Sequence, residues 1–559
     1  MRRGPRAARL AAFAQVILCC GSLAMAPTQA SEPPRKDAEA ALDLLIVDGL
    51  VLDGTGALLT RADVGVREGV IRFVGDGSSL KALRRIDASG LVVAPGFIDV
   101  HSHADSVMPD EGDSPTRASF ATASQGVTTA VFGPDGFYSA SRIEQRKETF
   151  RRFGVGVNYA FYVGHNGVRR EVLADPRARV APAQIELMAA QVRRGMTGGA
   201  VGLSTGLMYD PGMFADTDEV VALASAVRPF GGSYDSHVRD PVFKLLESDR
   251  EALEIGRRSG IGVKIAHEKA PGLMNHGRVV DIVALVNEAR SQGHDVVVDQ
   301  HPYDGASTGL LKDLFVLPSA PGRGREGNSM DAVRAALEDP AQRELVREAT
   351  LNGIAGGFSW LKAVGYGGLR VVASTEQPSL VGRNIELLAR ERGVDGFDLL
   401  ADLVTRYADV RLTMADIDEG DIRLLMVQPW TMVASDGNGI DAARSPAVCG
   451  HPRTMGTFPR VLGHYVREEG VLSLPDAVRK MTSLPAQYLR LSDRGRIAVG
   501  LAADITIFDP ARVADRATYE RPCEPSIGIE HVLVNGQAVI EAGKPTGALP
   551  GRFVPRQAS

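Results

Sequence analysis

The central part of the chain alternates short apolar stretches with stretches of helical character. The apolar stretches, which predict strands, are Gly126 to Phe132, Val155 to Val163, Ser233 to Val238, Val263 to His267 and Asp295 to Asp299, and the helical stretches include Pro182 to Gly195 and Asp216 to Val227. Repeated strand–helix units predict an α/β fold, with a parallel sheet closed into a (β/α)8 barrel of the TIM type. An open doubly wound sheet is the alternative, but no Gly-x-Gly-x-x-Gly turn opens one of these units.

Short strands with tight turns stand on both sides of this region. From Leu44 to Val74 an apolar alternation is broken at Asp53-Gly54 and Glu68-Gly69, as hairpins require. A similar pattern returns at Ala503 to Phe508 and His531 to Ile540. Neither block is large enough to close a sheet alone. We therefore expect one small β-sandwich built from residues 44–94 and 491–553, and a barrel domain spanning 95–490.

The stretch 310–368 interrupts the strand–helix rhythm. It contains the run Pro318 to Gly324, followed by a helix of mixed charge. A long insertion beside the strand ends predicts a lid over the barrel, and a plain surface excursion is the alternative.

The first thirty residues have the pattern of a secretory signal. Four arginines (Arg2, Arg3, Arg6 and Arg9) precede the apolar run Leu10 to Met25, and small residues allow cleavage before Ser31. An uncleaved anchor is the alternative, but the run is too short to span a bilayer comfortably. A lipoprotein modified at Cys19 or Cys20 is a minor alternative. We expect an exported protein, periplasmic or secreted, with no stable membrane span in the mature chain.

Charge and cysteine content exclude several classes of protein. The 63 basic and 68 acidic residues give a formal net charge of -5, which supplies no electrostatic reason for a nucleic-acid partner. A small-molecule substrate is the expected partner, and the sequence carries no signal of oligomeric state. Only Cys449 and Cys523 remain after the leader, so the mature chain has no disulfide framework, although one bridge is possible.

The segment Ala94 to His103 carries the sharpest chemical signal. Its apolar strand ends in His101-Ser102-His103, so both imidazoles project from the same side of the strand. Neutral imidazole is a natural ligand of zinc. Taken alone, the pair also fits two histidines that only satisfy hydrogen bonds.

Three more polar residues stand at later strand ends. They are His237, His267 and Asp436, the last of which follows an apolar run and precedes Gly437. The chain has only 11 histidines, and four of them fall at predicted barrel strand ends. Four histidines and an aspartate predict a site for one or two divalent cations with a position left open for water.

The order of these motifs resembles the amidohydrolase superfamily, and the intervening sequence is similar to its D-aminoacylase (N-acyl-D-amino-acid deacylase) branch. The resemblance covers Leu44 to about Gly551, and its most specific string is Gly202 to Gly212. The other matching segments are Gly126 to Thr129, Asn158 to Ala160, Val163 to His165, His301 to Tyr303 with Ala306 to Thr308, and His451 to Phe458.

The resemblance implies a zinc cofactor of one or two ions. It implies that His101, His103 and Asp436 bind one metal ion and that His237 and His267 bind the other. Where similar D-aminoacylases carry a Gly-Asn-Cys-Gly turn with a metal-contacting cysteine, this chain has Gly133-Pro134-Asp135-Gly136. We expect Asp135 to bridge the metals, because a carboxylate can replace a thiolate there. The alternatives are that this segment is merely a turn, or that Lys264 or Lys269 supplies a carbamate bridge.

The expected reaction is hydrolysis of the amide bond of an N-acyl-D-amino acid. In this prediction a metal-bound hydroxide attacks, and Asp436 accepts the proton and returns it to the leaving nitrogen. The D preference is implied only by the resemblance. The substrate-binding candidates are Tyr209, Lys269, Ser307, Arg444 and His165, and for each the alternative is a packing or solvated role.

Other hydrolytic reactions are compatible with the same residues. A dipeptidase for peptides with a D-residue and a cyclic-amide hydrolase would use the same metal site. A non-catalytic barrel that only binds its ligand is disfavoured, because all four histidines and Asp436 are present together.

Overall fold

Eight parallel strands form the central sheet of the computed structural model. In sheet order they are β6 (Phe97–Asp99), β8 (Val127–Phe132), β9 (Asn158–Gly164), β10 (Gly202–Gly206), β11 (Ser233–His237), β12 (Val263–Ile265), β13 (Val296–Gln300) and β17 (Thr431–Val433). The first and last of these are joined beyond their ends by the parallel pair β7 (Ser102–His103) and β18 (Gly437–Asn438). The amide of Asp436 also donates to the carbonyl of His101. This closure confirms the predicted barrel.

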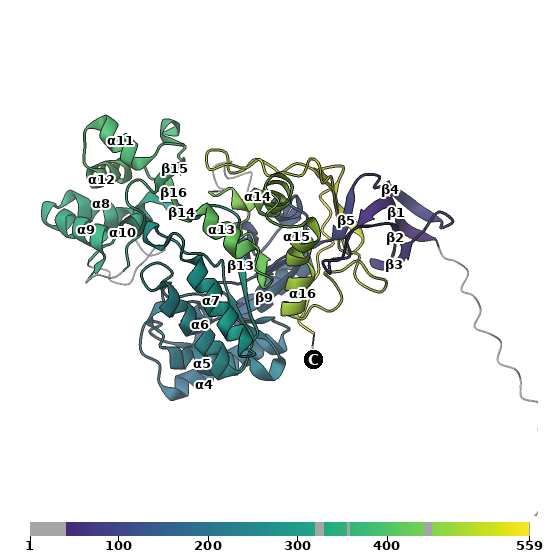
Figure 1. Cartoon of the computed structure of the whole chain (residues 1–559). Coiled ribbons are helices and arrows are strands. Elements are labelled where there is room, and N and C mark those ends of the chain that lie inside the picture. The colour runs from purple at the N-terminus through teal and green to yellow at the C-terminus, as the bar shows by residue number, and fades with distance from the viewer. Residues whose placement is uncertain (1–40, 319–328, 355–357, 441–449, 558–559) are drawn as a thin grey trace, which may run out of the picture. The chain divides into compact units, whose positions relative to one another are not determined.

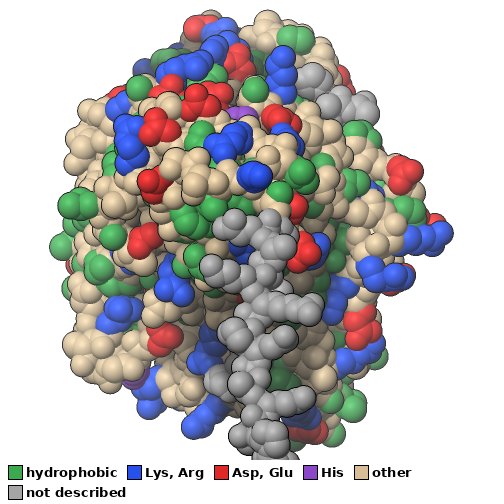
Figure 2. Space-filling model, turned by 90° about the vertical axis from the view of Figure 1, so that its right-hand side faces the viewer, with side chains coloured by type: hydrophobic (Ala, Val, Ile, Leu, Met, Phe, Trp, Pro, Cys, Tyr) green, Lys and Arg blue, Asp and Glu red, His purple; other side chains and the backbone are tan. Residues whose placement is uncertain are grey.

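The structure describes residues 41–318, 329–354, 358–440 and 450–557, and for 306–308 only the backbone. The leader 1–30, Arg444 and Cys449 therefore lie outside the described residues, whereas Cys523 is disulfide-bonded. None of the described helices has the length and apolarity that crossing a bilayer would require. On the face drawn in Figure 2, basic and acidic side chains are interspersed.

Helices that follow the strands cover the barrel, and α4 to α7 pack against one another in sequence order (Figure 1). Capping side chains set several of their starts: Asp216 accepts from the amide of Glu219 at the start of α5, and Ser139 does the same for Arg142 at α2. The helices are α1 (Phe120–Ala123), α2 (Ala140–Phe153), α3 (His165–Val172), α4 (Pro182–Thr197), α5 (Thr217–Ser225), α6 (Leu245–Ser259), α7 (Val279–Ser291), α13 (Glu419–Met426), α14 (Arg453–Arg460), α15 (Leu474–Met481) and α16 (Ser483–Leu489).

A unit with its own sheet is inserted between β13 and β17. Its elements are β14 (Gly305–Leu310), α8 (Met330–Glu338), α9 (Pro340–Asn352), α10 (Trp360–Val364), β15 (Leu369–Ala373), α11 (Ile385–Arg392), α12 (Gly396–Arg406) and β16 (Arg411–Ala415). The three strands pair antiparallel in the order β14-β16-β15. The unit buries a separate hydrophobic cluster that includes Phe315, Val346 and Leu400. We call residues 305–415 the inserted unit; the predicted lid 310–368 is only part of it.

Strands that precede and follow the barrel in the sequence build a second, nine-stranded sheet. It contains β1 (Leu42–Val51), β2 (Thr60–Arg67), β3 (Val70–Gly75), β4 (Ala82–Asp87), β5 (Val92–Pro95), β19 (Ile505–Phe508), β20 (Ile529–Val534), β21 (Gln537–Glu541) and β22 (Lys544–Pro545). The two halves meet where β5 pairs antiparallel with β19, opposing Ala94 and Thr506. A shared cluster around Ile46, Val64 and Leu533 stabilises the sheet. The prediction that both chain segments build one extra β domain is confirmed.

Gly96 marks the passage from this sheet into the barrel. It joins β5 to β6, and a β-carbon placed there would lie 2.1 Å from Oγ1 of Thr128 on β8. Such a distance is well inside van der Waals contact, so only glycine lets the first barrel strand lie this close to the second. The close approach places the His-x-His segment at the barrel rim.

Candidate metal centre

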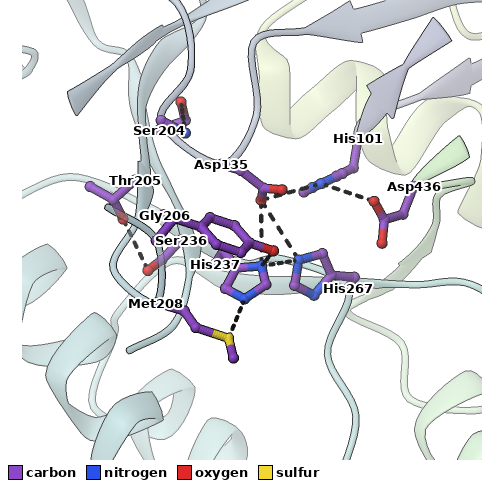
Figure 3. Close-up of polar contacts among 12 residues, drawn as sticks. His101, Asp135, Ser204, Thr205, Gly206, Met208, Ser236, His237, His267 and Asp436 are labelled. Atoms are coloured by element: carbon purple, nitrogen blue, oxygen red, sulfur yellow. Dashed lines mark hydrogen bonds and ion pairs between the residues drawn. The ribbon is translucent and has the colours of Figure 1, made fainter. Parts of the chain in front are cut away.

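The predicted ligands converge at the carboxyl ends of the barrel strands. His101 and His103 follow β6, Asp135 follows β8, and His237 ends β11. His267 follows β12 and Asp436 follows β17. Because the strands are parallel, residues at these ends meet at one rim of the barrel. Figure 3 shows His101, Asp135, His237, His267 and Asp436 pointing toward one another.

The carboxylate of Asp135 lies at the centre of this group. Its Oδ1 is 3.5 Å from Nε2 of His101, 3.6 Å from Nδ1 of His237 and 3.7 Å from Nε2 of His267. Its Oδ2 is 3.5 Å from Nε2 of His103. Asp135 thus contacts the histidines of both predicted metal positions, which is the arrangement required of a bridging ligand.

Asp436 approaches the first histidine pair from the other side. Its Oδ1 is 3.3 Å from Nε2 of His103 and 3.6 Å from Nε2 of His101. Two ligand atoms bound to one zinc at about 2.0–2.1 Å and tetrahedral angles lie roughly 3.3 Å apart. The spacing therefore suits a cation among these three side chains. Two groups of ligand atoms, His101–Asp135–His267 and His101–His103–Asp436, are each mutually within 4.8 Å.

Several buried polar atoms at this centre have no hydrogen-bond partner among the described residues. Both ring nitrogens of His101 and Oδ1 of Asp135 are buried and make no hydrogen bond within the described part of the chain. Leaving buried polar atoms unpaired is costly, and metal ligation would satisfy them. The ring nitrogens of His237 and His267 are only 2.7 Å apart, a hydrogen-bond distance that is shorter than two ligands of one tetrahedral ion would show. The donor set as a whole fits divalent cations.

The two buried carboxylates of this centre also need positive charge nearby. Burial alone would raise the pKa of Asp135, but His101 and the other rings outweigh it and hold that pKa well below its usual range. Burial lowers the pKa of His103, yet its hydrogen bonds to Asp135 and Asp436 outweigh this and raise it to about 10. Two ionised carboxylates in a buried site require positive charge, from protons or from metal ions.

Three of the converging residues have left-handed backbone conformations. The φ angles are 57° at Asp135, 37° at His267 and 45° at Asp436. Positive φ is uncommon outside glycine and costs conformational free energy. Each of the three lies shortly after a barrel strand. The sharp turn at that residue directs its side chain toward the open end of the barrel.

Arg453 contacts Asp436 directly. At the start of α14, its Nη1 lies 2.6 Å from Oδ2 of Asp436. Burial would raise the pKa of Asp436, but the Arg453 guanidinium and His103 outweigh it and hold that pKa well below its usual range. Sequence reasoning missed this contact, although the segment His451 to Phe458 that contains Arg453 stood among the matching motifs.

A cavity of about 330 Å³ opens over the ligands. The barrel rim contributes polar groups to its wall, including Tyr209, Lys269 and Arg453. Its apolar part is formed by Phe137, Met208, Pro241, Pro271, Leu310 and Trp360. The inserted unit also contributes Asp313 and Arg411. The cavity therefore joins the candidate metal centre to a wall of mixed polarity.

The structure brings two of the five predicted substrate-binding residues to this cavity. The hydroxyl of Tyr209 lies 3.2 Å from Nδ1 of His237, and Nζ of Lys269 lies 2.9 Å from Nδ1 of His267. Arg444 lies outside the described residues. Ser307 lies in β14, but its side chain is outside the described part.

His165 is not part of the cavity wall. Its buried ring lies at the start of α3, where Nε2 is 2.8 Å from Oε1 of Glu219. Arg169 donates to the same carboxylate. This placement gives no support to substrate contact by His165 and fits its alternative role of bracing the strand-end loop.

Neither lysine near His267 is placed as a carbamate bridge. Lys264 lies inside the barrel, where its ammonium contacts Asp235 and Asp299. Burial lowers its pKa, but the two carboxylates outweigh this and raise it above its usual range, which favours the charged ammonium. Lys269 donates to the carbonyl of His267. Asp135, by contrast, lies within 3.7 Å of a ring nitrogen of each of the four histidines.

Known proteins are similar to this chain in sequence and in structure. Residues 326–540 match a model described as an amidohydrolase family. The chain is 33% identical over 539 residues to a D-aminoacylase of Alcaligenes xylosoxydans xylosoxydans, an alignment that covers 92% of this chain and 98% of that protein. The chain belongs to the D-aminoacylase family of amidohydrolases. An N-acyl-D-glutamate deacylase of the same organism is also 33% identical, over 93% of this chain and 97% of that protein.

Solved structures of the D-aminoacylase family share the architecture. An N-acyl-D-glutamate deacylase from Bordetella bronchiseptica, complexed with zinc and a phosphonate mimic of the tetrahedral intermediate, superposes with a TM-score of 0.74 at 31% identity, covering 93% of this chain and all of the other. A D-aminoacylase structure gives the same TM-score at 32% identity, over 92% of this chain and all of the other. The predicted family membership and fold are thus confirmed.

Proposed function

We propose that this protein hydrolyses the amide bond of N-acyl-D-amino acids and releases a carboxylic acid and a free D-amino acid. The observation that carries the reaction class is the convergence of four histidines, Asp135 and Asp436 at one barrel rim, where all of them except the buried His101 line one cavity. The substrate class is supported by the family, whose members include a D-aminoacylase and deacylases named for N-acyl-D-glutamate and N-acyl-D-aspartate.

Zinc is the proposed cofactor. His101, His103 and Asp436 would hold one ion, His237 and His267 a second, and Asp135 would contact both. A divalent cation at this place polarises a carbonyl oxygen and lowers the pKa of a water molecule. The remaining requirements of amide hydrolysis fall to side chains of the chain itself.

Asp436 is the proposed general base and acid. It is ionised at neutral pH, because its pKa is held well below the usual range by the partners described above. Its Oδ2 is occupied by Arg453, which leaves Oδ1 on the side of His101 and His103. In this position it can accept a proton from the attacking water and return it to the leaving nitrogen, which is otherwise a poor leaving group.

Cationic side chains in the cavity wall suit the carboxylate of an amino acid. Lys269 and Arg453 both line the cavity, and each is within hydrogen-bonding range of a residue of the metal centre. A carboxylate bound by them would lie beside the amide to be cleaved. The hydroxyl of Tyr209 stands next to His237 and can donate to the carbonyl oxygen of the same substrate.

The decisive experiment is a hydrolysis screen of zinc-replete protein over paired N-acetyl-D- and N-acetyl-L-amino acids. We expect turnover of D-substrates and at least a tenfold lower kcat/KM for the L-partners. Dipeptides with a D-residue and cyclic amides form the comparison set. Turnover confined to that set would overturn the substrate proposal, and turnover of nothing in the panel would overturn the reaction class.

We also propose that the enzyme acts after export. The arginines and apolar run of residues 1–30 support this. Fractionation of cells expressing the full chain, followed by N-terminal sequencing, should find protein that begins at Ser31 outside the cytoplasm. Full-length protein in the cytoplasmic fraction would contradict the proposal.

A further inference from the structure

Three charged side chains are buried inside the barrel, below the metal centre. Asp235, Lys264 and Asp299 come from the neighbouring strands β11, β12 and β13, and none is exposed. The residues flanking them in sequence, such as Val263 and Ile265, pack in the outer cluster between strands and helices. Because side chains alternate along a strand, the three charged residues point into the barrel.

The lysine pairs with both carboxylates. Nζ of Lys264 is 2.9 Å from Oδ1 of Asp235 and also contacts Oδ2 of Asp299. It lies 5.8 Å from the centre of the Tyr162 ring, which belongs to the inner barrel cluster. An unpaired charge at such a place would be strongly destabilising, so each of the three groups depends on the others for charge compensation.

This set coincides with a third group of ligand atoms. A ring nitrogen of His101 and oxygens of Asp235 and Asp299 lie mutually within 4.8 Å, as the two groups of the metal centre do. Here, however, a protein ammonium already contacts both carboxylates. Lys264 therefore supplies the positive charge that faces these two carboxylates.

The set is connected to the metal centre through Asp299. Its Oδ1 accepts a hydrogen bond of 2.7 Å from the amide of His267, while its Oδ2 contacts Lys264. Its backbone carbonyl accepts from the amide of Glu268, also at 2.7 Å. These bonds hold the segment in which His267 has its left-handed conformation, with φ of 37°. The direction of the His267 ring thus depends on where Asp299 is held.

We propose that Lys264 is a positioning residue for the metal centre: its ammonium fixes the carboxylate of Asp299, and that carboxylate fixes the backbone of His267. The inference rests on the proposed function only in assuming that zinc is the ion bound. It concerns how tightly the ion is held, so it is tested without substrate.

The sign of the effect separates positioning from simple electrostatics. If Coulomb repulsion between the ammonium and the metal ion alone set the affinity, removing the positive charge would strengthen metal binding. Loss of positioning has the opposite sign, and changes to groups that orient metal ligands typically cost 10–100-fold in affinity. We expect Lys264→Met to weaken zinc binding by that factor, as measured by competition with a chromophoric chelator.

A double-mutant cycle tests the route through Asp299. If Lys264 acts through that carboxylate, Asp299→Asn weakens zinc binding in the same direction, and Lys264→Met/Asp299→Asn loses little more than Lys264→Met. Effects that multiply would overturn the route. Should Lys264→Met fail to fold, Asp299→Asn, which preserves the volume, decides alone: unchanged zinc affinity then overturns the proposal.

Lys480→Met is the matched control. Lys480 is also a buried lysine, but its ammonium donates to the carbonyls of Gln428 and Thr431, at the far end of β17 from Asp436. We expect this variant to bind zinc within twofold of the parent. Zinc content per chain is measured alongside. Unchanged or tighter zinc binding by Lys264→Met would overturn the proposal, whereas absent hydrolysis with this zinc pattern intact would count only against the proposed substrate.

Discussion

The barrel rim and the inserted unit both line the same cavity, but they contribute different chemistry. The rim supplies buried, mutually contacting ionisable groups, such as Asp135 and Asp436, in strained backbone conformations. The inserted unit supplies Leu310, Trp360 and Arg411, of which Trp360 belongs to a separate hydrophobic cluster. Strand ends fixed by the barrel suit catalysis, which needs exact placement, and a separately packed wall can vary without disturbing them. Chemistry and substrate preference should therefore be separable by mutation.

Removal of metal should give the largest contrast between the two regions. We expect a chelator to abolish hydrolysis and zinc to restore it. Hydrogen exchange should speed up at the strand ends around His101 and His267 and stay unchanged in α12 of the inserted unit, because only the rim holds the ligands. Equal loosening of both regions would show that they are one cooperative unit and would break the comparison.

Asp436→Asn should lower kcat by about 10³-fold or more, since it removes a proton acceptor that alone contributes 10²–10⁴-fold. Single-turnover rates at saturating substrate and zinc measure the effect. The matched variant is Asp313→Asn, a carboxylate of the inserted unit in the same cavity. It should change kcat by less than tenfold; a similar loss in both variants would remove the distinction between rim and wall.

Asp135→Ala should weaken zinc retention by about 100-fold, because Asp135 contacts all four histidines. Metal analysis after dialysis against a chelator measures this. Asp135→Cys, which restores the residue of similar D-aminoacylases, should retain most of the zinc. If the alanine variant keeps its metal and its rate, the Pro134-Asp135-Gly136 segment is only a turn.

The smallest effect is expected for Arg411→Met in the inserted unit. A guanidinium in the wall favours substrates with an acidic side chain, so its loss should lower kcat/KM for N-acetyl-D-glutamate relative to N-acetyl-D-leucine by up to about tenfold. Zinc content should be unchanged. An equal loss of kcat/KM for both substrates would show that Arg411 does not select the substrate side chain.

The sequence was most informative where residue type and strand position coincide. His101, His103, His237, His267 and Asp436 were predictable because each stands at the end of an apolar strand, and parallel strands deliver their ends to one rim. The resemblance alone singled out Asp135 as a bridging candidate, because its own segment, Gly133-Pro134-Asp135-Gly136, indicates no more than a turn. Its central contacts depend on the packing of β8 against its neighbours and have no local signal.

Contacts between segments that are distant in the sequence could not be predicted from it. Arg453 reaches Asp436 from the start of α14, and Lys264 contacts carboxylates on two other strands. The inserted unit closes by antiparallel pairing of β14 with β16, about a hundred residues apart, so its bounds could not be inferred from the irregular stretch 310–368 alone. His165 stands at a strand end like the ligands, yet Glu219 binds it away from the cavity.

The first and last strands of the barrel meet at the place where the predicted metal ligands converge. The first strand leads into His101 and His103, and the last leads into Asp436. The short pair β7–β18, one backbone amide bond and two hydrogen bonds from Ser435 to the Asp99 carboxylate join them there. An ion held by His101, His103 and Asp436 would add a further link between the two ends of the barrel sheet, and by binding only the folded chain it would stabilise the fold. The stability of the folded chain, as well as its reaction, would then depend on the bound ion.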